Sequence, residues 1–392
     1  MRRTLLGILT FLLVCSTASC TRHPVTDPSP QAEDPFTYPF VRQTHVKRTP
    51  GAPYSRYKAL YLVTEDFEPE EKSAEEIREI SGILRFSSDL GARYGVPWTH
   101  FVLASSLAPA FVSKDADTRA AGADLVEAMR SALRGGDDCE LHVHHAPDAE
   151  FMEYLKTSGI APKETDERLR VRDSFLRDLP GYRQRKSFFF SAFDLAGYKE
   201  LVYRLVCGKR FLERALYDDR EQVTAFRPGA FDAGSTEDDV YVFYTALKAA
   251  GFAANSGLTA GTIGTPGFHV GNSPGKNVAD VASGDGSIFE ISPTSCPGGA
   301  INPVVSEDYE ALANAGAPDE IPVIVSVFHL NHLQRGYVYN RDAGDPEQQR
   351  AKVDETRERL EAHFREVAAL RDRKVLYPVT IRELMGILSE QH

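Results

Sequence analysis

Apolar runs and amphipathic segments alternate along most of the chain. Short runs rich in β-branched and aromatic residues predict buried strands, and apolar residues at helical spacing predict the helices between them. The strands are expected at 59–64, 99–103, 140–144, 223–226, 251–254, 288–291, 321–328 and 375–379. The helices are expected at 73–94, 116–134, 197–217, 237–250, 346–372 and from residue 381 onward. This alternation is typical of an α/β protein with a largely parallel sheet, open or closed into a barrel.

Three segments interrupt the alternation. Prolines recur among polar residues from 21 to 56, which predicts an extended, semi-rigid tether. Residues 150–196 are charged and irregular and indicate an insertion, and the Gly-, Asn- and Pro-rich residues 259–286 indicate a long loop. We therefore expect one large domain over residues 57–388, with the insertion inside it.

The first twenty residues have the pattern of a secretory signal. Arg2 and Arg3 precede an apolar stretch, and small residues then lead to Cys20. The end of this segment resembles a bacterial lipoprotein cleavage site, which implies that Cys20 is lipidated and anchors the chain to a membrane. Thr21 in place of Asp favours the outer membrane of a Gram-negative cell, facing the periplasm or the surface. A plain secretory signal is the alternative. A transmembrane anchor is not expected, because the apolar run is too short for a membrane span.

Charge narrows the range of partners. The 392 residues include 45 Lys and Arg against 56 Asp and Glu, so the formal net charge is −11. Removal of the signal takes away two arginines and no acid, which brings the charge to −13. Because an acidic protein repels phosphate backbones, nucleic acid is not expected as the main partner. No organic cofactor is expected either, and the cysteines Cys139, Cys207 and Cys296 show no zinc-type spacing.

Polar side chains follow four of the expected strands. The segments are Thr64-Glu65-Asp66-Phe67-Glu68, His142-Val143-His144-His145, Arg227-Pro228-Gly229 and His329-Leu330-Asn331-His332. In parallel α/β folds, function collects at the carboxyl ends of the strands, so these side chains are expected to lie together. Each segment also has a plainer interpretation, as a solvated turn or as the surface residues of a loop.

The histidines favour a metal site. His142 and His144 lie two apart, so their side chains share one face of a strand. Imidazoles with a carboxylate are the usual ligands of a zinc-type ion, and such an ion lowers the pKa of a bound water toward neutrality. A second carboxylate could then act as general base, held by Arg227 in a bidentate pair, and a later histidine could protonate the leaving group.

Taken in order, these segments resemble the motifs of the polysaccharide deacetylase (NodB-homology) family, carbohydrate esterase family 4 in the broad sense. The stretches 226–256 and 379–384 are also similar to that family, so the resemblance covers roughly residues 57–388. It implies a distorted (β/α)7 barrel. It also implies metal-dependent hydrolysis of an N-acetyl or O-acetyl group on a cell-envelope or extracellular glycan.

The resemblance also implies the ligands and the second carboxylate. Asp66, His142 and His144 would hold Zn²⁺, with Co²⁺, Ni²⁺ or Mn²⁺ as alternatives. Glu68 or Glu65 would be the second carboxylate. Which of the three acids is base and which is ligand stays open.

Two further roles follow from the same resemblance. Arg227 would orient the catalytic base. His329 would be the general acid, with His332 as the substitute.

Departures from the family pattern keep two other functions open. The paired Asp-Asp of the first motif is absent, and the Asp-Trp motif cannot be located, since the sole tryptophan is Trp98. A catalytically inactive envelope lipoprotein that binds a glycan or a partner is one alternative. A metal-dependent amidohydrolase that acts on a small amide is the other. The charge of −13 makes a neutral acetylated glycan a better-matched substrate than a strongly anionic polymer.

Overall fold

The computed structural model describes twelve ranges of the chain, and all of them belong to one compact unit within residues 35–392. The ranges are 41–43, 46–69, 73–143, 149–169, 188–190, 193–196, 198–229, 237–257, 288–291, 306–314, 318–335 and 345–391. Cys20, His144, Cys296 and the expected loop 259–286 lie outside them. None of the helices in these ranges combines the length and apolar character that a membrane span needs.

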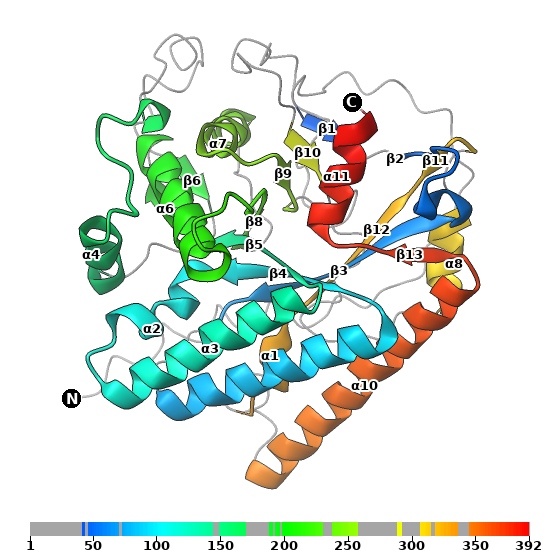
Figure 1. The fold of residues 1–392 in the computed structure, drawn as a ribbon, viewed down its shortest axis with the longest axis horizontal. Coiled ribbons are helices and arrows are strands. Elements are labelled where there is room, and N and C mark those ends of the chain that lie inside the picture. Colours follow the sequence, from blue (N-terminus) through cyan, green and yellow to red (C-terminus); the bar gives the residue numbers. More distant parts are fainter. Residues whose placement is uncertain are drawn as a thin grey trace, which may run out of the picture. The chain divides into compact units, whose positions relative to one another are not determined.

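A parallel sheet forms the centre of the molecule (Figure 1). Its strands in spatial order are β1 (Val41–Gln43), β10 (Ile288–Glu290), β9 (Ala254–Asn255), β8 (Ala225–Pro228), β5 (Asp138–Val143), β4 (Trp98–Leu103), β3 (Ala59–Phe67) and β12 (Val323–Phe328). β13 (Leu376–Pro378) pairs with the first residues of β3. The seven strands from β10 to β12 form a curled half-barrel, and no pairing among the described strands joins its two ends. The predicted α/β class and (β/α)7 type are confirmed.

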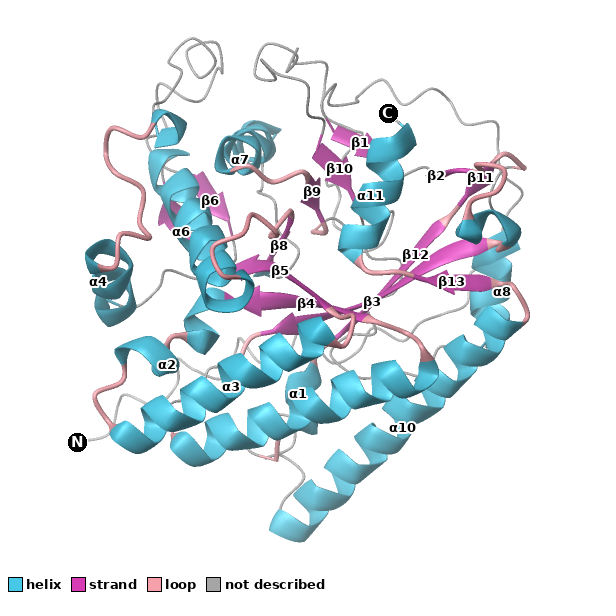
Figure 2. Cartoon of the chain, in the orientation of Figure 1, coloured by secondary structure: helices cyan, strands magenta, loops and turns pink. Residues whose placement is uncertain are grey.

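Six of the described helices lie close to their predicted positions (Figure 2). They are α1 (Ala74–Tyr94), α3 (Ala116–Arg134), α6 (Tyr198–Tyr217), α7 (Glu237–Ala250), α10 (Pro346–Asp372) and α11 (Ile381–Gln391). Three shorter helices were not predicted, namely α2 (Pro109–Val112), α4 (Ala149–Thr157) and α8 (Ser306–Asn314). Ser73 and Glu76 form the predicted capping box, in which each side chain accepts a hydrogen bond from the other's backbone N–H. The period of apolar positions therefore located the helices well.

The predicted strand 321–328 is wrong as a single element. Pro322 has no N–H to donate to a ladder, and it separates β11 (Glu320–Ile321) from β12. β11 leaves the main sheet and pairs antiparallel with β2 (Val46–Lys47).

Residues before the predicted domain boundary at residue 57 also take part in the sheets. β1 joins the main sheet and β2 pairs with β11, and Val46 and Tyr54 are buried. The packed part of the chain therefore begins at or before Val41. Within the expected insertion, the described residues include α4 and the antiparallel pair β6 (Phe188–Phe190) and β7 (Phe193–Ala196).

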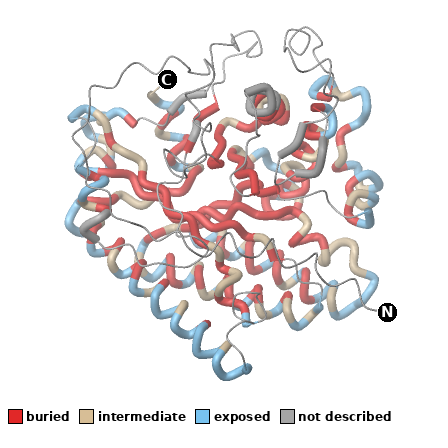
Figure 3. The backbone as a smooth tube through the Cα atoms, turned by 180° about the vertical axis from the view of Figure 1, so that it is seen from behind, coloured by how far each residue is buried: buried red, intermediate tan, exposed pale blue. Residues whose placement is uncertain are grey.

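The two faces of β3 pack against different helices. Tyr61 and Val63 belong to a cluster with residues of α1 and α10, whereas Leu60 and Leu62 pack with residues of α11. Figure 3 shows that the strands of the main sheet consist largely of buried residues. Since side chains alternate between the faces of a strand, Asp66 continues the α11 face, here called the inner face. Glu65 lies on the outer face.

A buried charged group occupies the outer face. The Glu65 carboxylate contacts Nδ1 of His100, and Nε2 of His100 lies 3.3 Å from Oδ2 of Asp137. Burial by itself would lower the pKa of His100, but the Glu65 carboxylate together with Asp137 outweighs it and raises that pKa to about 10. Oδ1 of Asp137 accepts the backbone N–H of Trp98 at 2.9 Å. An imidazolium thus ties β3, β4 and the residue before β5 together.

We predict that His100→Gln destabilises the fold by about 3–5 kcal/mol, because it leaves the buried Glu65 carboxylate without its cation. The folded pKa of about 10 lies above the unfolded value, so this stabilisation is complete below roughly pH 6.5 and is lost as the pH rises toward 10. Urea unfolding at pH 6, 8 and 10 measures the loss. The wild type should lose stability over this range and His100→Gln should lose less.

The matched control is His363→Gln. His363 is also buried, but burial lowers its pKa to about 4, so it carries no charge to lose above pH 6. The alkaline loss of stability should persist in this variant. Equal losses of stability at alkaline pH in the wild type and in His100→Gln would contradict the assignment of the buried charge to His100.

Candidate active site

Side chains from four strand ends meet on the inner face of the sheet. Nη1 of Arg227 on β8 donates to Oδ1 of Asp66 on β3 at 2.8 Å. Nε2 of His329, which follows β12, lies 3.6 Å from Oδ2 of Asp66 and 3.9 Å from Oε1 of Glu68. Nε2 of His142 on β5 lies 3.2 Å from Oε2 of Glu68. The structure therefore brings these five predicted residues together, as the strand-end argument expected.

Arg227 is entirely buried, and each of its three nitrogens is hydrogen-bonded. Nε donates to the carbonyl of Ser256 at 2.9 Å, and Nη2 donates to Thr64 Oγ1 at 2.9 Å and to Ser256 Oγ at 2.8 Å. The ring of Phe101 lies 3.9 Å from the guanidinium carbon, within cation–π range. The expected bidentate pair is not formed, since only Nη1 reaches Asp66.

Asp66 is ionised at neutral pH in this environment. Burial raises the pKa of its carboxyl, but the guanidinium of Arg227, together with His142 and His329, outweighs burial and holds that pKa below its usual value. Only 3% of Asp66 is exposed. One carboxylate oxygen is held by Arg227, and the other faces His329.

The two nitrogens of His142 have different partners. Nδ1 lies 2.9 Å from the carbonyl oxygen of Arg227, and since a carbonyl only accepts, Nδ1 is the donor. Nε2 then faces the Glu68 carboxylate, and a neutral imidazole would present a second acceptor there. Because two acceptors repel each other, a cation has to lie between Nε2 and the Glu68 oxygen, either a proton or a metal ion. A ring nitrogen held by a backbone carbonyl is typical of metal-binding histidines.

The donor set therefore suits a metal ion in part. Among the described residues, no group of three His, Cys, Asp or Glu side chains is placed to hold one. The third predicted ligand, His144, lies outside the described ranges.

Two further candidates differ from this group in their surroundings. Glu65 is on the outer face with His100, so it does not share the inner face with Asp66 and Glu68. Burial, with the neighbouring His329, lowers the pKa of His332 to about 4, so His332 is neutral at pH 7. The imidazole of His329 is 21% exposed and contacts both inner carboxylates.

The sequence prediction missed the residues that hold Arg227. The hydroxyl of Ser256 donates to the carbonyl of Ile291 at 2.8 Å, and that of Thr64 donates to the carbonyl of Ser326 at 3.0 Å. Both oxygens are thereby left to accept from Arg227. Ser256 comes directly after β9, so the strand-end rule applied to that strand would have found it.

Comparisons with known proteins add a structural likeness. No family model matches the sequence. No curated protein matches it either. A candidate polysaccharide deacetylase from Mycobacterium smegmatis is 14% identical, with 89% of this chain and 96% of that chain covered and a TM-score of 0.42.

Two further solved structures have a TM-score of 0.33. A family 4 carbohydrate esterase from Bacillus anthracis is 12% identical, with 89% of this chain and 88% of that chain covered. A candidate fructose-1,6-biphosphate aldolase from Coccidioides immitis is 14% identical, with 81% and 92% covered.

We predict that Arg227→Gln destabilises the protein by about 3–5 kcal/mol at pH 7, because Asp66 keeps a buried charge and loses its cation. The folded pKa of Asp66 lies below the unfolded value, so the stabilisation by this pair is present above about pH 4 and is lost as the pH falls further. Urea unfolding at pH 7 and pH 3.5 should show a smaller difference between variant and wild type at the lower pH.

Arg359→Gln is the control, since Arg359 lies on the exposed surface of α10 and pairs only with Glu355 among the described residues. The free energy of unfolding of Arg359→Gln should stay within about 0.5 kcal/mol of the wild-type value. An Arg227→Gln variant as stable as the wild type at pH 7 would show that the pair contributes nothing to the fold.

Proposed function

We propose that the protein is a metal-dependent hydrolase that removes acetyl groups from a cell-envelope or extracellular glycan. The observation that carries this proposal is the buried Arg227 that keeps Asp66 ionised beside Glu68, His142 and His329. A base, a ligand pair and an acid are thus available on one face of the sheet. The sequence adds a proposed location, in which lipidated Cys20 anchors the chain to the outer membrane.

We assign the metal to Glu68, His142 and the predicted third ligand His144. Glu68 replaces Asp66 as the carboxylate ligand, because Oδ1 of Asp66 is engaged by Arg227 while Glu68 directly faces Nε2 of His142. A divalent metal at this position, Zn²⁺ first of all, would supply Lewis-acid activation of a water molecule and of the substrate carbonyl.

Asp66 is the general base in this mechanism. Its ionised carboxylate accepts a proton from the attacking water, whose oxygen bonds to the acetyl carbon. Arg227 keeps Asp66 in place and charged before the reaction. His329, which is partly exposed at the site, donates a proton to the departing nitrogen or oxygen as its bond to the acetyl carbon breaks. The products are acetate and a free amine or hydroxyl group on the glycan.

Metal content distinguishes the two carboxylates. We expect about one equivalent of zinc in the purified wild type, and loss of it in His142→Ala and Glu68→Gln, because each removes a ligand. Asp66→Asn should retain the metal, because Asp66 acts on the water instead. Elemental analysis after dialysis measures this. If Asp66→Asn loses the metal and Glu68→Gln retains it, then Asp66 is the carboxylate ligand and Glu68 is not.

Acetate release from acetylated chitooligosaccharides tests the chemistry. Asp66→Asn and His329→Gln should each lower the rate by about 10²–10⁴-fold, since each removes one proton transfer. His332→Gln is the control and should stay close to wild type, because His332 is neutral at pH 7. A metal-loaded wild type that binds glycan without releasing acetate would indicate the inactive binding protein. One that cleaves only small amides would indicate the amidohydrolase.

A further inference from the structure

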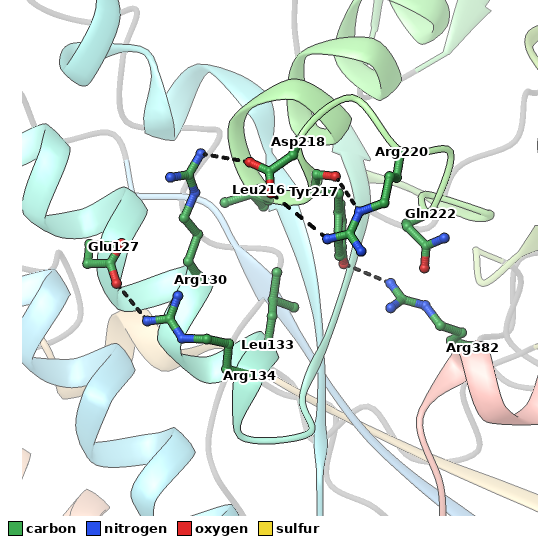
Figure 4. Close-up of a pocket in the computed structure, with 10 residues that line it drawn as sticks. All are labelled: Glu127, Arg130, Leu133, Arg134, Leu216, Tyr217, Asp218, Arg220, Gln222 and Arg382. Carbon is green, nitrogen blue, oxygen red and sulfur yellow. Dashed lines mark hydrogen bonds and ion pairs between the residues drawn. The ribbon is translucent and has the colours of Figure 1, made fainter.

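A polar pocket lies at the other end of β5 from the candidate active site. It is a cavity of about 360 Å³ between the C-terminal parts of α3 and α6 and the start of α11 (Figure 4). Arg382 on its rim pairs with Asp138, the first residue of β5. His142 comes four residues later on that strand, about 13 Å away. The pocket is therefore separate from the group around Asp66.

Arginine dominates the lining of this pocket. Four arginines line it against two acidic residues. They are Arg130 and Arg134 on α3, Arg220 in the segment that follows α6, and Arg382 on α11. In a chain with a net charge of −11, this concentration of guanidinium groups stands out.

The two acids offset these charges only in part. Glu127 pairs closely with Arg134, at 2.6 Å. Asp218 lies between Arg130 and Arg220, and its two oxygens are 3.9 Å and 4.0 Å from their nitrogens, beyond hydrogen-bond distance. Figure 4 shows the two guanidinium groups reaching Asp218 from opposite sides. Such exposed ion pairs contribute little, so another anion can compete for the same position.

Backbone contacts hold the two guanidinium groups in place. Nε of Arg130 donates to the carbonyl of Ala215 at 2.8 Å, and Nε of Arg220 donates to the carbonyl of Tyr217 at 2.9 Å. Both groups are thus oriented before any ligand arrives. A planar guanidinium matches the oxygens of a phosphate or carboxylate group.

The deeper wall of the pocket is partly apolar. Leu133, Leu216 and the buried Tyr217 contribute to it, and Nη2 of Arg382 donates to the Tyr217 hydroxyl at 2.8 Å. Nε of Arg382 is buried and has no hydrogen-bond partner within the described part of the chain. The pocket thus combines an anchored cationic rim and a surface against which a carbon skeleton can pack.

We propose that this pocket binds a small anionic ligand, a phosphate or carboxylate group on a carbon skeleton of about the size of a monosaccharide. The anionic group displaces Asp218 from between Arg130 and Arg220, and the carbon skeleton lies against the leucines. The volume of about 360 Å³ is at the small end of the range of roughly 300–1,000 Å³ found for small-molecule sites. This site is independent of the proposed deacetylase activity.

Calorimetric titration of the full chain tests the proposal with three probes. Glucose 6-phosphate and glucuronate carry the two anionic groups, and glucose is the neutral control. We expect at least one of the anions to bind, more weakly as NaCl is raised, and glucose not to bind. The preferred anion identifies the group that the pocket recognises.

Substitutions then locate the binding. Arg130→Gln and Arg220→Gln should each weaken it about tenfold, as expected for the loss of a charged hydrogen bond. Asp218→Asn should strengthen it, because the competing charge is removed while Asn still accepts the left-handed backbone at this position, where φ is 54°. Arg359→Gln, on α10, should leave the affinity unchanged.

Two results would overturn the proposal. One is the absence of binding by either anion to both the wild type and Asp218→Asn at millimolar concentration. The other is an affinity that neither Arg130→Gln nor Arg220→Gln changes, with circular dichroism showing both variants folded. Neither result bears on acetate release, so this site and the candidate active site are tested separately.

Discussion

The interior of the half-barrel depends on the buried charge of Arg227. An isolated buried guanidinium is strongly unfavourable, so the surrounding strands have to supply a counter-charge and acceptors. Asp66 on β3 provides the charge, and Thr64 on β3 and Ser256 after β9 provide the oxygens. Ser256 in turn donates to the carbonyl of Ile291, directly after β10. One side chain thereby ties strands from one side of the sheet to the other, and the same bonds orient the carboxylate that the proposed chemistry needs.

The outer face of β3 contains a second charged group that fixes the same register. A slip of one residue would move Asp66 outward and bring Glu65 to Arg227, and it would also separate Glu65 from His100. Such a slip would leave the buried His100 without its carboxylate partner, so it is disfavoured even though Arg227 would meet Glu65. The placement of Asp66 in the site is therefore held by contacts on the opposite face as well as by its own.

The sequence predicted those features whose cause is local. Helices 237–250 and 346–372 have the predicted bounds, because helical bonds and caps join residues that are close in sequence, as where Asp345 accepts from the N–H groups of Glu347 and Gln348. The meeting of the strand ends also followed, since it depends only on the strands being parallel. The break at Pro322 could have been read from the sequence, because proline lacks the donor that a continuous strand requires.

Partners that are distant in sequence could not be predicted in the same way. Glu65 pairs with His100 on the outer face of β3, whereas Asp66 pairs with Arg227 on the inner face. Both distinctions depend on which face a side chain occupies and what it meets there. The strand pairing of residues 41–43 and 46–47 could not be predicted either, because their partners are distant in sequence. Their proline-rich surroundings indicate only an extended chain.

Strand β5 connects the two polar ends of the molecule. Its inner face carries Asp138, Glu140 and His142, and through β4 the first two lie level with Thr64 and Asp66 of β3. Each has a fixed partner: Arg382 for Asp138, the backbone N–H groups of residues 224 and 225 for Glu140, and the Arg227 carbonyl for His142. Burial raises the pKa of Glu140 well above its ordinary value, so this carboxyl can be neutral while it accepts those bonds. One short strand thereby reaches from the group around Asp66 at one end to the arginine pocket at the other.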